Sequence, residues 1–298
     1  MFGEIKQTAA EFEKAADFLN GTEVQTEIAM HFTSLNWNLF ACQPWIDGFR
    51  YDERILTDFY HPLIGMGARV DVIGSRKKLD SYKILLSPYM MTLEEGNLAE
   101  RIEEWVKNGG VWIVGPMTDQ RNSIGTHYTD RAMGMLERLT GARLAFSAPD
   151  RGAYIKASWQ DGATFTGNLW FEMYDTSQEN TLVTVTGLHS AIKGKSLVMS
   201  FPVGRGQILL LGSIPSPDDL KRIFTLALDR AGVKLPKITG ELAVIPRSGA
   251  AGDGLILAEI GNHPASIALE EKMTDLLTGE TYVGHTELPP YSVLVLRR

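Results

Sequence analysis

Apolar positions in the first half of the chain follow two spacings, which predicts alternating strands and helices. Residues 3–20 carry apolar side chains every three or four positions, from Ile5 to Leu19, and Asn20-Gly21 ends this predicted helix. Strands are predicted next at 23–32, 68–74, 82–88 and 111–116. Helices are predicted at 54–66 and 92–107. Strands joined by connections of helical length favour an α/β fold with a doubly wound, mostly parallel sheet.

Two predicted helices carry capping signals. Thr92 and Glu95 have the spacing of a capping box, which predicts that a helix starts there. The glutamates of that helix, Glu103 among them, are expected to face solvent. The second helix, 217–231, starts with proline and two aspartates and ends at Gly232.

The pattern of predicted helices and strands changes twice in the second half of the chain. A helix is expected at 131–140, an irregular strand-rich stretch at 142–200 and a buried strand at 207–213. After about residue 238, short strands separated by Gly, Pro and Asn predict a small antiparallel β-domain. The organisation predicted from these patterns is an N-terminal helix (1–22), an α/β domain (23–236) and the β-domain (237–298).

Composition and charge narrow the function classes. The 298 residues include 44% hydrophobic residues and carry a formal net charge of −7, which disfavours nucleic-acid or anionic-membrane binding through net charge. A single cysteine, Cys42, excludes an internal disulfide framework and a cysteine zinc cage. We expect no signal peptide, no membrane span and a cytoplasmic protein.

Motifs that carry catalysis or bind cofactors are weak. Residues 187–196 nearly match a phosphate loop, but Gly187 is misplaced, because the motif needs glycine at His189, and a strand rather than a helix is predicted to follow. The turn at Gly115-Pro116 holds no nucleophile, and the six histidines are scattered. Adjacent glutamates on one helix surface cannot form the opposed pair of a glycosidase. We therefore predict no cofactor, no metal and no catalytic residue.

Aromatic residues gather in a predicted loop at 36–51. Trp37, Phe40, Trp45 and Phe49 stand there among amide side chains. This composition suits a subunit or domain interface, a local core or a carbohydrate contact, and the sequence leaves the three open.

The run from Val70 to Gly125 resembles the trimerisation domain of family 42 glycoside hydrolases, the bacterial β-galactosidases. The similarity rests on Val70-Asp71-Val72, Glu104-Trp105-Val106 before Gly109-Gly110, Val114-Gly115-Pro116 and Arg121. Gly204-Arg205-Gly206-Gln207 resembles a later turn of that family, and LPPYSVLVLR resembles its small C-terminal β-domain. The resemblance extends over essentially the whole chain.

The resemblance implies a flavodoxin- or amidotransferase-like sheet and a non-catalytic assembly module. The family's catalytic glutamates belong to a (β/α)8 barrel, and no residue here matches them. The implied partners are two further copies in a trimer or a separately encoded barrel subunit, with a galactoside at the interface. The candidate contact residues lie in loops 36–51 and 117–131, and they are Trp37, Phe40, Trp45, Phe49, Arg121, His127 and Tyr128.

Two other function classes stay open at this point. One is a sugar- or small-molecule-binding module that uses the aromatic residues of 36–51. The other is an amidotransferase-like enzyme, for which Cys42 is the residue to test.

Overall fold

The computed structural model describes residues 2–150, 154–187 and 190–298. The chain divides into two units, and each is described by itself. One comprises residues 27–62 and 71–233 and is called the α/β unit below. The other comprises 1–26, 63–70 and 234–298 and is called the β unit.

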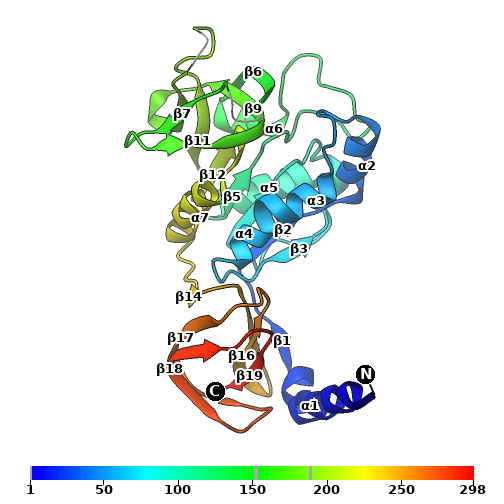
Figure 1. Cartoon of the computed structure of the whole chain (residues 1–298). Helices are drawn as coiled ribbons and strands as arrows, with labels where there is room; N and C mark the ends of the chain where they lie inside the picture. Colours follow the sequence, from blue (N-terminus) through cyan, green and yellow to red (C-terminus); the bar gives the residue numbers. More distant parts are fainter. Residues whose placement is uncertain (1, 151–153, 188–189) are drawn as a thin grey trace. The chain divides into compact units, whose positions relative to one another are not determined.

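The α/β unit is built on one mixed sheet (Figure 1). Its strands are β2 (Ile28–His31), β3 (Asp71–Ile73), β4 (Ile84–Ser87), β5 (Val111–Val114), β6 (Arg143–Asp150), β7 (Ala157–Trp159), β8 (Thr164–Phe165), β9 (Gly167–Asp175), β10 (Thr181–Val185), β11 (Ser196–Val203), β12 (Gly206–Leu211) and β13 (Ser213–Pro215). The helical segments are α2 (Ser34–Cys42), α3 (Tyr51–Ile55), the π-helical η1 (Leu56–Tyr60), the first half of α4 (His61–Ile64), η2 (Glu95–Asn97), α5 (Leu98–Lys107), α6 (Met135–Thr140), η3 (Gln178–Asn180) and α7 (Pro217–Ala231).

The sheet is parallel only along part of its width. Strands β3, β2, β4, β5 and β12 pair parallel in that order. The remaining pairings, from β12–β11 onward, are antiparallel. The prediction of an α/β fold is confirmed, but the prediction of a mostly parallel sheet is wrong, because the irregular stretch 142–200 extends the same sheet with antiparallel strands.

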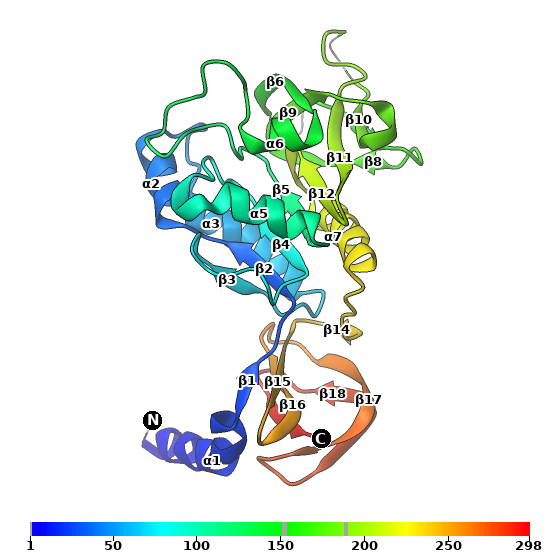
Figure 2. The ribbon, with the colours of Figure 1, turned by 180° about the vertical axis from the view of Figure 1, so that it is seen from behind.

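Helix α5 lies against the sheet (Figure 2), and a layer of buried apolar side chains joins the two. Leu98, Ile102 and Val106 recur on one side of α5 and are fully buried. They belong to one core with Trp112 and Val114 of β5, which alternate with the residues facing the other side of the sheet. The hydrophobic pattern therefore predicted this packing correctly.

Helix α7 confirms its capping signals. The Ser216 side chain accepts a hydrogen bond from the Asp219 backbone, Pro217 occupies the first turn, and Gly232 adopts the left-handed conformation at the end. The first N–H groups and the last C=O groups of a helix have no partner within it, and these two caps provide partners for some of them. Local sequence therefore predicted both ends of α7 correctly.

Three local predictions are wrong. Residues 36–42 of the predicted loop 36–51 belong instead to helix α2, which the Thr33 side chain caps. The capping box at Thr92 is not formed, because α5 starts at Leu98 after Asn97 in the left-handed conformation. Thr92 is instead buried, and its backbone N–H donates to Asn36. The helix expected at 131–140 is confined to α6.

The β unit is an antiparallel sheet, as the C-terminal pattern predicted. It contains β1 (Thr22–Val24), β14 (Ile238–Thr239), β15 (Leu242–Gly249), β16 (Gly252–Glu259), β17 (Ala265–Asp275), β18 (Thr281–Leu288) and β19 (Val293–Arg297), with helix α1 (Phe2–Asn20). Ala15 and Phe18 of α1 pack on Val295 in a small core. The first half of α1 is exposed, and Phe2, Ile5 and Phe12 of its apolar stripe meet solvent.

Candidate functional site

The loops that follow the parallel strands hold the candidate residues. Helix α2 follows β2, and the long segment 115–134 follows β5, so both lie at the carboxyl edge of the parallel strands. In open α/β sheets this edge is where binding crevices form. The chain therefore brings its two candidate loops, far apart in sequence, to one end of the sheet.

A cavity of about 290 Å³ opens at this edge. Trp45 and Trp170 meet edge to face with ring centroids 4.9 Å apart. The Arg121 guanidinium lies 5.5 Å from the Trp45 ring centroid, and the His127 ring lies 6.5 Å from it. Two indoles, a guanidinium and an imidazole thus form one wall, a composition typical of protein–protein contacts.

Among the described residues of this cavity, some hydrogen-bond donors have an acceptor and others have none. Arg121 donates to Gly125 O at 2.8 Å and also contacts the Gln43 side-chain oxygen. Within the described part of the chain, the Trp45 indole N–H and the Arg121 Nε–H are buried without a hydrogen-bond partner. Each buried unpaired donor costs about 1–3 kcal/mol, so this wall is less stable alone than a fully bonded one.

The surroundings of His127 favour its neutral imidazole over the charged form. Burial lowers the pKa of its imidazole, and the nearby Arg121 charge lowers it further. Its Nδ1 lies 3.2 Å from Gln120 O, which fixes Nδ1 as the protonated nitrogen because a carbonyl can only accept.

The buried carboxylate of Glu172 accepts hydrogen bonds from two residues that line this cavity, Trp170 and Gln120. Glu172 Oε1 accepts from the Trp170 indole at 2.9 Å, the Gln120 amide at 2.7 Å and the Met117 backbone at 3.0 Å. Its Oε2 accepts from the Tyr174 hydroxyl at 2.8 Å. Burial raises the pKa of Glu172, while these four bonds oppose the shift. Glu172 thereby positions both Trp170 and the start of the segment that carries Arg121.

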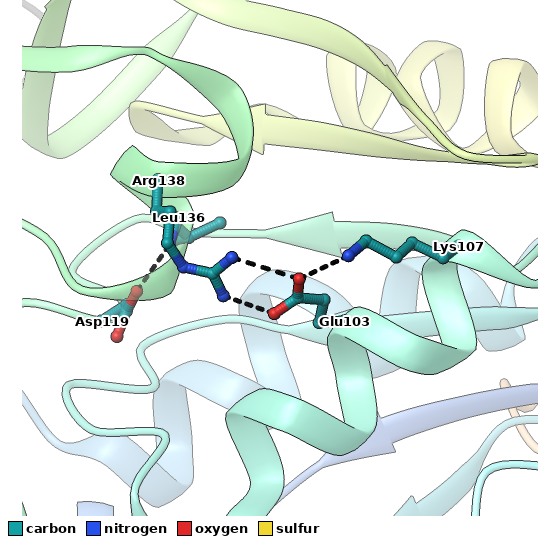
Figure 3. Close-up of polar contacts among 5 residues, drawn as sticks. All are labelled: Glu103, Lys107, Asp119, Leu136 and Arg138. Atoms are coloured by element: carbon teal, nitrogen blue, oxygen red, sulfur yellow. Dashed lines mark hydrogen bonds and ion pairs between the residues drawn. The ribbon is translucent and has the colours of Figure 1, made fainter.

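A second, larger pocket of about 640 Å³ lies between the segment 115–134, α5 and α6. Asp119 lines it, and its carboxylate accepts from the Leu136 backbone N–H at 2.8 Å. Figure 3 shows that the Arg138 guanidinium in the same pocket bonds Glu103 instead of Asp119. Burial raises the pKa of Asp119 to about 7.

Glu103 was expected to face solvent, and this is wrong. Its side chain is only 15% exposed and pairs with Arg138 and, at 2.7 Å, with Lys107. The bonds from these two cations lower the pKa of Glu103 to about 2. Glu94, whose carboxylate accepts from the Ser123 backbone, is likewise structural.

The residues singled out from the sequence do not all come together in the structure. Trp45, Arg121 and His127 converge on the smaller cavity, while Tyr128 lines the larger pocket. Phe40 and Phe49 are buried in an aromatic cluster with Tyr51 and Tyr89, as a local core would have them. Trp37 is 48% exposed on α2. Cys42 is exposed at the end of that helix.

Sequence reasoning missed Trp170, Gln120, Glu172 and Asp119. Glu172 carried a readable signal, because it is the one acid inside the otherwise apolar run LWFEMY of a strand. Buried strand positions rarely hold a carboxylate unless donors surround it. No comparable signal marked Asp119, since its burial depends on the path of a long loop.

Three further features considered in the sequence can be followed in the described residues. Residues 196–203 after the near-match to a phosphate loop form strand β11, and His189 lies outside the described residues. No group of three acidic, histidine or cysteine side chains in the described residues is placed to hold a metal ion. No helix in those residues is long and apolar enough to cross a bilayer.

The chain belongs to the β-galactosidase trimerisation domain family, whose family model matches residues 26–234. The match covers the whole of the α/β unit, which contains both pockets. The resemblance inferred from short motifs is thereby confirmed.

Curated relatives are β-galactosidases of greater length. The chain is 28% identical over 256 residues to β-galactosidase YesZ of Bacillus licheniformis, covering 84% of this chain and 38% of that protein. It is 29% identical over 265 residues to YesZ of Bacillus subtilis, covering 87% and 39%. The chain therefore spans about two fifths of the length of these relatives.

Solved structures share the fold along the whole chain. The β-galactosidase from Bacillus circulans sp. alkalophilus matches with a TM-score of 0.91 at 19% identity, over 100% of this chain and 45% of that one. A catalytic mutant of Gan42B, a GH42 β-galactosidase from G. stearothermophilus, matches with a TM-score of 0.87 at 19% identity, over 100% and 44%.

Proposed function

We propose that this chain is a non-catalytic assembly module that brings three copies together in a β-galactosidase-type complex. The observation that carries the proposal is the match of the trimerisation family to residues 26–234. The chain spans 38–39% of its curated relatives, which leaves the larger part of those proteins to supply the chemistry.

We infer that copies meet through the carboxyl edge of the parallel strands, here called the assembly face. It consists of Trp37, Ile124 and the cavity residues Trp45, Arg121, His127 and Trp170. Ile124 is 80% exposed and Trp37 is 48% exposed, so burying them would add favourable free energy. Tryptophan and arginine are the residues most often dominant at protein contacts. A closed three-fold contact is heterologous, so this face would meet a different patch on the next copy.

The catalytic partner is part of the same proposal. The relatives are named β-galactosidases, so we infer that a catalytic barrel, in the same polypeptide or a separate one, accompanies this module and binds a galactoside. The exposed apolar half of α1 in the β unit is a candidate contact for this barrel.

We also propose a division of the chain into linker helix 1–22, α/β domain 23–236 and β-domain 237–298. We propose a cytoplasmic location as well, which the single cysteine supports.

Two measurements test this proposal. Analytical ultracentrifugation of the purified chain should show a mass of three copies, and Ile124→Glu should shift it toward one copy because a buried unpaired charge is costly. The matched control is Leu226→Glu on α7, which changes an exposed apolar residue outside the assembly face and should leave the trimer intact. Galactoside hydrolysis by the purified chain alone would contradict the non-catalytic assignment.

A further inference from the structure

One buried carboxylate holds together both ends of the segment that forms much of the assembly face. This segment, residues 117–134, is called the edge loop below. Near its start, Asp119 accepts from Gly134 N at 2.9 Å through its backbone carbonyl and from Leu136 N at 2.8 Å through its side chain. The Asp119 backbone N–H donates to Met90 O at 2.9 Å. One residue therefore closes a loop of 18 residues.

The fit around Asp119 is close. Asp119 is only 2% exposed and has a φ of 60°, which aspartate and asparagine tolerate better than most residues. A Cβ added at Gly134 would lie 2.7 Å from Asp119 Oδ1 and 3.1 Å from the Tyr128 hydroxyl. Glycine at 134 thus lets the far end of the loop approach the carboxylate.

The groups that face Asp119 leave its charge without an ion pair. The acids around the pocket are Glu94 and Glu100 on the α5 side and Glu137 on α6, and the other ionisable groups are Tyr128, Arg131 and Arg138. Arg138 bonds Glu103, which Lys107 also binds (Figure 3). Arg131 bonds Asp130 at 3.1 Å and lies over the Tyr128 ring. Both arginines are therefore committed to other partners, and Asp119 keeps only backbone donors.

We propose that protonation of Asp119 controls closure of the edge loop and, through it, the assembly of copies. The inference rests on the proposed function, because the edge loop carries Arg121, Ile124 and His127 of the assembly face. In the closed loop an ionised Asp119 is desolvated, and the charge of Glu94 disfavours it while that of Arg131 favours it. Opening the loop hydrates the carboxylate. A protonated Asp119 removes that charge, so acidic solution favours the closed loop.

The direction and size of the pH effect on loop closure follow from the difference in the Asp119 pKa between the closed and the open loop. Burial raises the pKa of Asp119 from 3.8 to about 7 in the closed loop, so the closed form binds the proton more tightly than an open, hydrated one. Closure is therefore favoured below the ordinary value and is lost progressively as pH rises toward 7. From pH 6 to pH 8 the ratio of closed to open loop is expected to fall about tenfold.

Hydrogen exchange at the Gly134 and Leu136 amides measures this ratio directly, after correction for the intrinsic pH dependence of exchange. Protection should fall about tenfold from pH 6 to pH 8 in the unsubstituted chain. In Asp119→Asn, whose side-chain oxygen can still accept from Leu136 N, it should change less than twofold. Asp229→Asn is the matched control, since it removes an exposed acid on α7 and leaves Arg131 bonded to Asp130, and it should behave as the unsubstituted chain does.

Ultracentrifugation of the same three proteins at both pH values separates the two proposals. The trimer should dissociate more readily at pH 8 than at pH 6, except in Asp119→Asn. Equal falls in protection in all three proteins, or no fall in any, would overturn the role of Asp119. Monomers at both pH values with the expected exchange pattern would refute the proposed assembly function and leave the loop's response to pH standing.

Discussion

Removal of the Glu172 carboxylate is predicted to destabilise the α/β unit more than any surface change. In Glu172→Ala, three buried donors lose their acceptor: the Gln120 amide, the Tyr174 hydroxyl and the Met117 backbone N–H. The fourth, the Trp170 indole, is half-buried and can find water. At about 1–3 kcal/mol for each of the three orphaned donors, the expected loss is about 3–9 kcal/mol. Glu172→Gln keeps one acceptor oxygen, so we expect a loss of about 1 kcal/mol.

Tryptophan fluorescence during urea unfolding measures this loss. All six tryptophans lie in the α/β unit, so their signal follows that unit and not the β unit. The difference between the two variants removes most of the uncertainty about the unfolded state. If Glu172→Ala unfolds within 1 kcal/mol of the unsubstituted chain, the buried carboxylate does not support the cavity wall and the reasoning is refuted.

Two further predictions concern an ion pair and a small core. Because bonds from Arg138 and Lys107 hold the pKa of Glu103 near 2, Arg138→Ala should raise that pKa toward 4.5 in a carboxyl NMR titration. The stabilisation from Glu103 is present above pH 4.5 and is lost as pH falls toward 2, so an unchanged acid limb of stability in Arg138→Ala would contradict the pairing. Phe18→Ala should destabilise the β unit by about 3–5 kcal/mol, because Phe18 is buried against Val295. Far-UV circular dichroism of its unfolding checks this, and no shift in the midpoint would show that α1 does not belong to that core.

The parts of the fold that the sequence predicted are those where local chemistry decides the conformation. Helix α7 has a serine cap, a proline in its first turn and a glycine at its end, and it forms as predicted. The stripe of α5 predicted its buried side, but Thr92 misled the prediction of its start. There the tertiary hydrogen bond between the Thr92 backbone and Asn36 took precedence over a local capping box.

The candidate site was predictable in part. Aromatic and basic residues singled out Trp45, Arg121 and His127, which do converge on one cavity. Their partner Trp170 comes from β9, whose pairing depends on contacts distant in sequence, so no local pattern places it there. Asp119 escaped notice for the same reason, since its burial requires the edge loop to return to the start of α6.

The mass of the purified chain in solution tests the central claim most directly. Sedimentation equilibrium over a range of concentrations should show association into three copies, weakened by Ile124→Glu and unaffected by Leu226→Glu. A single species with the mass of one copy at every concentration would contradict the claim that this chain itself brings copies together.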